Sequence, residues 1–193
     1  PSDARVALLM QESGFSLAAS DGAQAVIPFS QGLLGGGLDP LSAAKALEPL
    51  LTGSRRLILF NAKRLKTELA PWDLAVTAPF DDDQIMQYLI APQSGKYEAP
   101  ENAAALFTQT LSDEQTLDAQ EMSRLYREIE LPLLDTLYAM ERDGFLVDRD
   151  ELAQLGAQYD AQIADLKEEI FSLCGCAPFN LNSPQQLGDI LFN

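Results

Sequence analysis

The sequence predicts an α/β domain with a mixed sheet and flanking helices, followed by an all-α helical hairpin. Residues 1–120 begin with an apolar strand and a hairpin and then alternate helix and strand patterns, which is typical of a mixed sheet covered by helices. After residue 120 the apolar residues recur only at helical spacing. Of the 193 residues, 47% are hydrophobic, so the chain can bury a core. We therefore expect an α/β domain over residues 1–120 and a separate helical part over residues 121–193.

Strands are expected where short apolar runs of the first part meet turn residues. Asp21 and Gly22 lie between two such runs and predict the turn of a β-hairpin. The continuous apolar run RLILF is suited to a buried central strand. The expected strands are 5–10, 14–19, 24–29 and 56–60, with 73–77 as a further candidate.

Helices of the first part are expected from their start signals. Asp39 is a natural N-cap and Pro40 fits the first helical position. The carboxylates of residues 81–83 precede another helix, where they favour the helix dipole. The expected helices are 40–51, 61–69, 83–90 and 101–110, with a loop rich in Pro, Gly and Ser at 91–100.

The second part is expected to contain three helices. The first follows apolar spacing as far as Gly144, and Pro132 must kink it or divide it in two. Asp148 caps the next, an amphipathic helix of roughly six turns that we expect to pack antiparallel on its predecessor. Ser183 with Gln186 predicts the start of a third helix. Because this helix is barely two turns long and the chain has no initiator Met, we expect an excised fragment.

The composition excludes several classes of site. The chain has no histidine, so it cannot form a Ser-His-Asp system, a Cys-His system or a His-bearing zinc site. Carboxylate chemistry remains, either as acid–base pairs or as Asp and Glu clusters that hold Mg²⁺ or Mn²⁺. Cys174 and Cys176 are too close for a useful cross-link and favour a reducing, cytoplasmic setting. The sequence has neither a run of 18 apolar residues nor a signal-peptide pattern, so we expect no membrane partner.

The net charge of −16 predicts weak or no DNA binding by this chain alone, because nucleic-acid binding normally needs a basic face. Five cations nevertheless fall within twelve residues, and we call them the basic cluster: Arg55, Arg56, Lys63, Arg64 and Lys66. They could contact DNA phosphates, although a solvated helix face is the favoured interpretation. The run Asp81, Asp82 and Asp83 could likewise bind a metal ion, but a helix start is favoured. The glycines at 35–37 indicate a loop tip and not a phosphate loop.

Two extended motifs in the helical part carry a family resemblance. The first reads E-x-P-L, then M-E-x-x-G, then a hydrophobic pair and Asp; it is matched at Glu130, Pro132, Leu133, Met140, Glu141, Gly144 and Asp148. The second, F-N-x-N-S-P-x-Q-L-x-x-I-L-F, is matched at Phe179, Asn180, Asn182, Ser183, Pro184, Gln186, Leu187, Ile190, Leu191 and Phe192. In this order, residues 128–193 resemble the entry to the polymerase domain of bacterial DNA polymerase I, the family A polymerases.

In that family the preceding domain is a 3′–5′ proofreading exonuclease with a ribonuclease-H-like sheet, and residues 1–120 resemble a reduced relative of it. Three segments carry this part of the resemblance in the family's order. They are AVIPF, LILFNAKRLKTEL, which the family usually reads N-x-K-x-D, and PFDDDQIMQYLIAP, which it usually reads F-D-T-x-x-x-x-Y-L-L-x-P.

The resemblance implies that this domain is catalytically silent. The active exonuclease needs four carboxylates to hold two metal ions. The first two come from D-x-E on the first strand, but Val6–Met10 carries no acid and the next one is Glu12. The third falls on Leu65, since Asn61 and Lys63 fix the alignment. The fourth belongs to a Tyr-x-x-x-Asp helix for which this chain has no segment. We therefore expect no catalytic residue and no metal ligand here.

The favoured hypothesis is a fragment of DNA polymerase I whose residues 1–120 support the polymerase domain and guide DNA past the basic cluster. The resemblance implies that the parent enzyme extends a primer with dNTPs in DNA replication and repair. It would use Mg²⁺ on carboxylates beyond Asn193, so we expect no cofactor in this fragment, and we expect a monomer at the bacterial nucleoid. One alternative is residual metal-dependent exonuclease activity through Glu12, Asp81, Asp82 and Asp83. Another is an acidic protein-interaction module.

Overall fold

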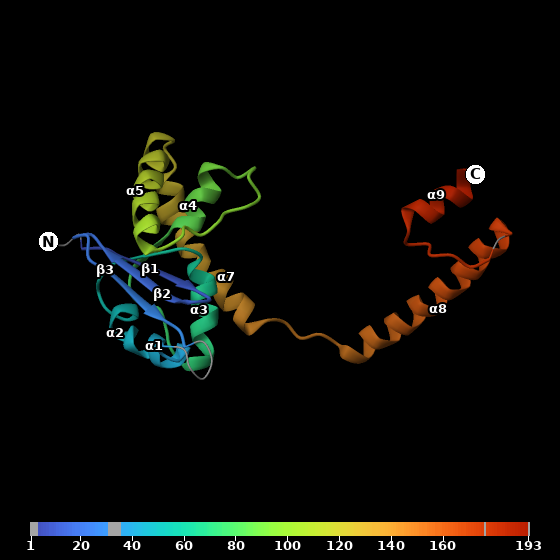
Figure 1. Ribbon diagram of the computed structural model, residues 1–193, viewed down its shortest axis with the longest axis horizontal. Helices are drawn as coiled ribbons and strands as arrows, with labels where there is room; N and C mark the ends of the chain where they lie inside the picture. The colour runs from blue at the N-terminus through green and yellow to red at the C-terminus, as the bar shows by residue number, and fades with distance from the viewer. Residues whose placement is uncertain (1–3, 31–35, 176, 193) are drawn as a thin grey trace. The chain divides into compact units, whose positions relative to one another are not determined.

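The computed structural model describes residues 4–30, 36–175 and 177–192, and the chain divides into two compact units, Pro1–Gly144 and Phe145–Asn193 (Figure 1). The first unit includes the helices up to residue 143, which the sequence pattern assigned to the helical part. The domain boundary at residue 120 was predicted from the end of the strand signals and not from compactness, so it stays a prediction. Within the described residues, no helix combines the length and the apolar character that a membrane span requires.

The first unit contains a mixed five-stranded sheet, as predicted. Its strands are β1 (Val6–Gln11), β2 (Gly14–Ala19), β3 (Gln24–Pro28), β4 (Leu57–Leu59) and β5 (Phe80–Asp82). They lie in the order β3-β2-β1-β4-β5, with antiparallel pairs from β1 to β3 and parallel pairs from β1 through β4 to β5. The hairpin predicted at Asp21-Gly22 joins β2 to β3, and Gly22 has the positive φ of 88° that such a turn needs.

Helices surround this sheet. They are α1 (Pro40–Ala46), α2 (Glu48–Leu51), α3 (Ala62–Leu69), the 3₁₀ turn η1 (Ala70–Trp72), α4 (Asp83–Ile90), α5 (Ala103–Ala119), α6 (Ser123–Leu125), the π-helical turn η2 (Tyr126–Glu130) and α7 (Leu131–Asp143). As predicted, Asp39 caps α1 through a bond from the backbone N–H of Ser42. Pro132 lies in the first turn of α7, just after η2, where the lost N–H matters least.

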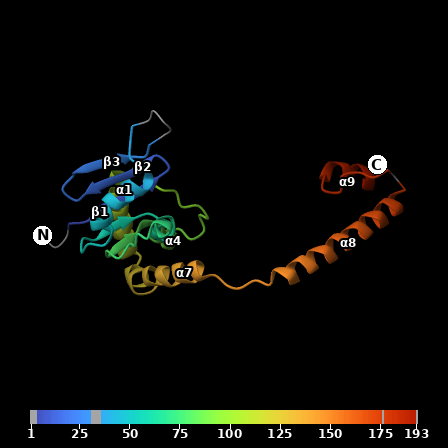
Figure 2. The same ribbon diagram turned by 90° about the horizontal axis from the view of Figure 1, so that it is seen from below.

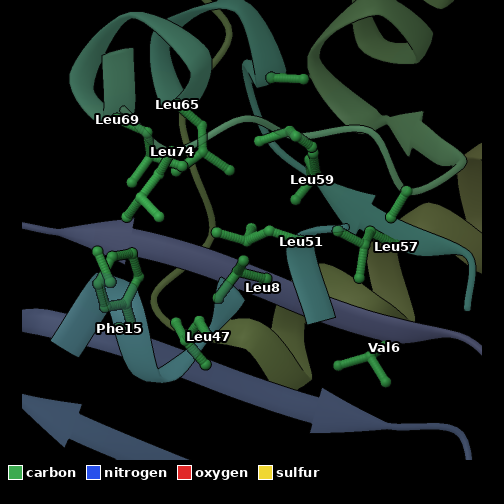
Figure 3. Packing of buried hydrophobic residues seen from close by; sticks show 14 of the residues in the cluster. Val6, Leu8, Phe15, Leu47, Leu51, Leu57, Leu59, Leu65, Leu69 and Leu74 are labelled. Carbon is green, nitrogen blue, oxygen red and sulfur yellow. The ribbon is translucent and has the colours of Figure 1, made fainter. Parts of the chain in front are cut away.

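Alternate residues of each central strand face opposite layers of the unit. Val6, Leu8, Leu57 and Leu59 pack on one face against α1, α2 and α3 (Figure 3). On the other face, Ala7, Leu9 and Ile58 pack against Ala103 and Leu106 of α5. This period of two gives both faces of the sheet an apolar layer, and each fully buried leucine contributes about 2 kcal/mol to stability.

Helix α7 belongs to the first layer. It lies beside α3 and runs past the sheet toward residue 144 (Figure 2). Leu134 of α7 is 6% exposed and is part of the same core cluster as Leu8 and Leu57. The first unit therefore has its own hydrophobic core, and α7 completes it.

Four elements differ from the sequence prediction. The helix expected over 40–51 breaks at Leu47, because Pro49 cannot donate the backbone bond that would continue it. The strand considered at 73–77 is wrong: the backbone N–H groups of Thr77 and Ala78 donate to the carbonyl of Leu51 and not to a ladder. Residues 80–82, expected only to lead into a helix, form the edge strand β5. Helix α5 continues to residue 119, well past the expected end at 110.

The second unit contains α8 (Arg149–Cys174) and α9 (Pro184–Phe192). Asp148 caps α8, as predicted, by accepting bonds from the backbone N–H groups of Asp150 and Glu151. None of the described residues of this unit is buried, and apolar side chains of α8 such as Leu152 and Ile163 are about half exposed. The antiparallel packing expected for α8 stays a prediction. Cys176 lies outside the described residues.

Candidate functional site

The aspartates at residues 81–83 lie where β5 passes into α4, and each has a different neighbourhood. All three are at most 6% exposed. This burial is unusual for three consecutive carboxylates, because a charge removed from water must be compensated by hydrogen bonds or an opposite charge. Their partners therefore decide whether they could serve as metal ligands.

Asp82 joins the starts of two helices. Its carboxylate accepts the backbone N–H of Ala62 at 2.6 Å, at the start of α3, and that of Gln84 at 3.0 Å, at the start of α4. Longer bonds of 3.3 Å come from the N–H groups of Asn61 and Ile85. Burial raises the pKa of Asp82, and these four bonds oppose that rise. The carboxylate thus satisfies helix N-termini that would otherwise be left without acceptors.

Asp83 connects α4 to α5. Its carboxylate accepts the hydroxyl of Thr110 at 2.8 Å and the side-chain amide of Gln87 at 2.9 Å. Burial raises the pKa of Asp83 to about 6, and the nearby charges of Asp113 and Asp82 add to the rise. The group therefore takes up a proton at a higher pH than an exposed aspartate, and both of its oxygens accept bonds inside the protein.

Asp81 faces the opposite side of β5 from Asp82 and pairs with Arg56 at 3.3 Å. Burial raises its pKa, and the charge of Arg56 opposes the rise. In register, Asp81 is level with Ile58 of β4 and with Ala7 of β1. The ion pair consequently lies near the amino ends of the parallel strands.

Glu12 lies away from these aspartates. It follows Gln11 at the carboxyl end of β1, whereas Asp81 is level with Ala7, which lies roughly 13 Å before Gln11 along the strand. Among the described residues, no three carboxylate or thiol side chains lie close enough together to hold one metal ion. Of the four candidate ligands, Glu12 thus lies apart, Asp82 binds helix starts, Asp81 pairs with Arg56, and Asp83 binds Thr110 and Gln87.

A groove of about 230 Å³ opens at the carboxyl ends of β1 and β4. Its walls include Leu9 and Met10 of β1, Phe60 after β4, and Leu65 of α3. Leu65 is the position that the resemblance aligns with the third exonuclease carboxylate. Tyr97, from the loop between α4 and α5, also lines the groove, and the side chain of Gln11 donates to the carbonyl of Glu101 in that loop. The groove also has polar lining residues, and its one acid, Glu68, pairs with Arg64 at 2.6 Å.

The basic cluster is largely paired within the chain. Arg56 bonds Asp81, Lys63 bonds Glu141, Arg64 bonds Glu68, and Lys66 bonds Asp135. Arg55 is exposed and has no ion pair among the described residues. Contact of the cluster with DNA stays a prediction, and the two lysine pairs show a use within the chain that sequence spacing did not indicate.

Two partners of this region were missed by sequence reasoning. The phenol of Tyr126 and the hydroxyl of Thr110 reach the aspartates from 44 and 27 residues away. No local spacing connects them to residues 81–83. A polar Thr110 on an otherwise apolar face of α5 was the available signal. Gly36 and Gly37 lie in a loop beside β3, and Gly35 is outside the described residues.

Comparison with known proteins identifies relatives of this chain. No family model matches the chain. It is 43% identical to DNA polymerase I of Chloroflexus aurantiacus over 98 residues, 49% of this chain and 10% of that protein. With DNA polymerase I of Bacillus subtilis it shares 40% over 90 residues, 46% of this chain and 10% of that protein. With the thermostable DNA polymerase I of Thermus thermophilus it shares 32% over 143 residues, 63% of this chain and 17% of that protein.

A solved structure extends the likeness to nearly the whole chain. The POL domain of Pol1 from M. smegmatis, in complex with DNA primer-template and dNTP, aligns with a TM-score of 0.71 and 25% identity over 97% of this chain and 36% of that one. The chain spans about a tenth to a sixth of the length of these curated relatives. The predicted resemblance to bacterial DNA polymerase I is therefore confirmed, for a segment of that protein.

Proposed function

We propose that this chain is a segment of a bacterial DNA polymerase I that takes part in DNA replication and repair by adding dNTPs to a primer. The three curated relatives described above are DNA polymerase I, and the aligned solved structure is a polymerase domain bound to DNA primer-template and dNTP. DNA is therefore the proposed partner of the parent protein, at the nucleoid in the cytoplasm. Mg²⁺ is the proposed cofactor of its polymerase site, to which we assign none of the residues described here.

We propose further that residues 1–120 form a ribonuclease-H-like domain without exonuclease activity. The observation that carries this proposal is the use of the buried aspartates. Asp82 holds two helix starts, Asp83 holds Thr110 and Gln87, and Asp81 pairs with Arg56. A two-metal site needs carboxylates that converge with free oxygens. The groove beside Leu65 supports the same proposal, because an apolar leucine stands where the resemblance aligns the third exonuclease carboxylate.

The proposed role of this domain is to hold the first helix of the polymerase part. Lys66 of α3 is the centre of that contact. Its ammonium pairs with Asp135 of α7 and lies 5.0 Å from the ring centre of Phe80 and 5.9 Å from that of Tyr138. Leu134 enters the main core one residue before Asp135. Lys63 adds a pair to Glu141 at 2.7 Å near the end of α7. These contacts run along two successive turns of α3 and fix the orientation of α7 on it.

A nuclease assay tests whether residues 1–120 lack exonuclease activity. The whole chain, with Mg²⁺ or Mn²⁺, is incubated with a single strand labelled at its 5′ end, and shortening from the 3′ end is followed on a gel. We expect the strand to stay intact. If it shortens, the same assay is run on Glu12→Gln and Asp81→Asn, two alternative ligands that hold no helix start. Shortening that either substitution abolishes would overturn the proposal, whereas shortening that persists in both indicates a contaminating nuclease.

A further inference from the structure

A second cleft, of about 430 Å³, lies on the first unit, beside the Asp81–Arg56 ion pair. We call it the arginine cleft, and its lining residues are Arg5, Arg56, Asp81, Glu114, Arg127 and Leu131. Arg56 is the member of the basic cluster that lines it. Three guanidinium groups and two carboxylates meet here, which leaves a positive excess on a chain whose net charge is −16.

The register of the parallel strands brings the first two arginines together. Val6 of β1 pairs with Leu57 of β4, so the residues that precede them, Arg5 and Arg56, lie side by side at the amino ends of the two strands. The backbone N–H of Val6 donates to the carbonyl of Arg56 at 3.1 Å, which fixes this level. By the period of two, both side chains share the α5 face of the sheet with Ile58.

The two carboxylates of the cleft accept bonds from only some of the guanidinium N–H groups. Arg5 bonds Glu114 of α5 at 2.6 Å through Nη1, and both side chains are about four-fifths buried. Arg56 reaches Asp81 and the carbonyl of Phe80 at 3.3 Å, in both cases through Nη1, and its side chain is 49% exposed. Arg127, from η2, has neither an ion pair nor a hydrogen bond among the described residues. The free edges of Arg56 and Arg127 thus face one solvent-filled cleft.

We propose that the arginine cleft binds a phosphate group through Arg56 and Arg127, with Arg5 adding positive charge. A guanidinium presents two parallel N–H donors that match two oxygens of a phosphate, and such charge-assisted bonds are stronger than neutral ones. The two carboxylates are already held by Arg5 and Arg56, so they do not compete for Arg127. A free phosphate, a nucleotide and the end or backbone of a DNA strand all carry this group, and the experiment below separates them.

Calorimetric titration of the whole chain with inorganic phosphate at low salt tests the site. We expect saturable binding of one phosphate per chain, weakened about tenfold in Arg127→Ala, which removes one charged pair of donors. Arg56→Lys should weaken it by a similar factor although the charge is kept, because a lysine lacks the planar fork. The matched control is Arg124→Ala: Arg124 lies three residues from Arg127, is 85% exposed, pairs with Glu128 and does not line the cleft. Its affinity should stay within about twofold of the parent value.

Lost phosphate binding can be told apart from lost folding. Arg127 is exposed and its side chain has no partner among the described residues, so we expect Arg127→Ala to keep the fold, and circular dichroism checks this. Absence of saturable binding up to about 10 mM phosphate, a range that weak sites reach, overturns the proposal. Equal loss in Arg127→Ala and Arg124→Ala also overturns it, since it would indicate unspecific attraction. Competition with a short thymidine strand then identifies the source of the phosphate. The strand is used with and without a 5′-phosphate. Displacement only by the 5′-phosphorylated strand indicates a terminal phosphate, and displacement by both forms indicates the backbone.

Discussion

The phenol of Tyr126 takes the place of a neighbouring strand at the edge of the sheet. The backbone N–H of Asp82 donates to the phenolic oxygen at 2.8 Å, and the hydroxyl faces the carbonyl of the same residue at 3.5 Å. Asp82 belongs to β5, the last strand of the order, whose other edge pairs with β4. One side chain therefore satisfies both backbone groups that an edge strand leaves unpaired.

Removal of that hydroxyl should destabilise the first unit. In Tyr126→Phe the ring still fills its buried place, but the N–H of Asp82 loses its acceptor inside the protein. An unsatisfied buried donor costs about 1–3 kcal/mol, so urea unfolding should show a loss of that size. Tyr159→Phe is the control, because Tyr159 of α8 is 58% exposed and its hydroxyl has no hydrogen bond among the described residues. Equal stability of Tyr126→Phe and the parent chain would contradict the role given to the phenol.

Asp83 should make the stability of the first unit depend on pH. Its pKa is raised from 3.8 to about 6 in the folded chain, so between these values the folded state binds more protons than the unfolded state. The contribution is complete below pH 4 and is lost as the pH rises through 6. It amounts to roughly 3 kcal/mol, and burial raises the pKa values of Asp81, Asp82 and Asp113 in the same direction.

The measurement is urea unfolding at a series of pH values between 4 and 8. Asp83→Asn should flatten the decline of stability that the parent chain shows between pH 4 and pH 7. Asp150→Asn, an exposed first-turn residue of α8, should leave the decline unchanged. A parent chain that gains stability as the pH rises from 4 to 7 would show that the burial of Asp83 is not maintained in solution.

Much of the first unit follows from local signals in the sequence. The strands β1, β2, β3 and β4 were predicted from apolar runs and a turn pair, and the cap at Asp39 from its residue type. The strand β5 could not be predicted, because three residues ending in two aspartates have no strand pattern. It forms because β4 offers a parallel edge and Tyr126 completes the other side, both of which are long-range effects.

The candidate site likewise has features that the sequence could predict and features that it could not. The absence of histidine and the apolar residue at Leu65 were readable, because they depend only on residue identity and alignment. The partners of the aspartates could not be predicted, because Thr110 and Tyr126 are distant in sequence and come close to them only in the folded chain. The ion pairs of Lys63 and Lys66 with α7 join residues 78 and 69 positions apart. A cluster of cations in sequence therefore says little about which of them keep a free charge.

Lys66 should control how firmly α7 is held. In Lys66→Met the aliphatic stem is preserved, but the pair with Asp135 and the attraction to the rings of Phe80 and Tyr138 are lost. Together these are worth about 1–2 kcal/mol for a side chain that is only 11% exposed. Hydrogen exchange of residues 131–143 should accelerate accordingly. Arg64→Met is the control, because its pair with Glu68 stays within α3, and acceleration of equal size in both variants would contradict the role of Lys66.

Leu134 should be the strongest single attachment of α7 to the first unit. It is 6% exposed within the main core cluster, next to residues of β1 and β4, whereas Leu137, one turn on, is 40% exposed. Leu134→Ala leaves a cavity between α7 and the sheet side, and such a change costs about 2–5 kcal/mol. Leu137→Ala removes the same atoms from a half-solvated place and should cost less than about 1 kcal/mol. Urea unfolding followed by the fluorescence of Trp72, the single tryptophan, measures both, because Trp72 packs against the same cluster. If both variants lost the same stability, α7 would not be part of this core, and the structural role proposed for residues 1–120 would lose its main support.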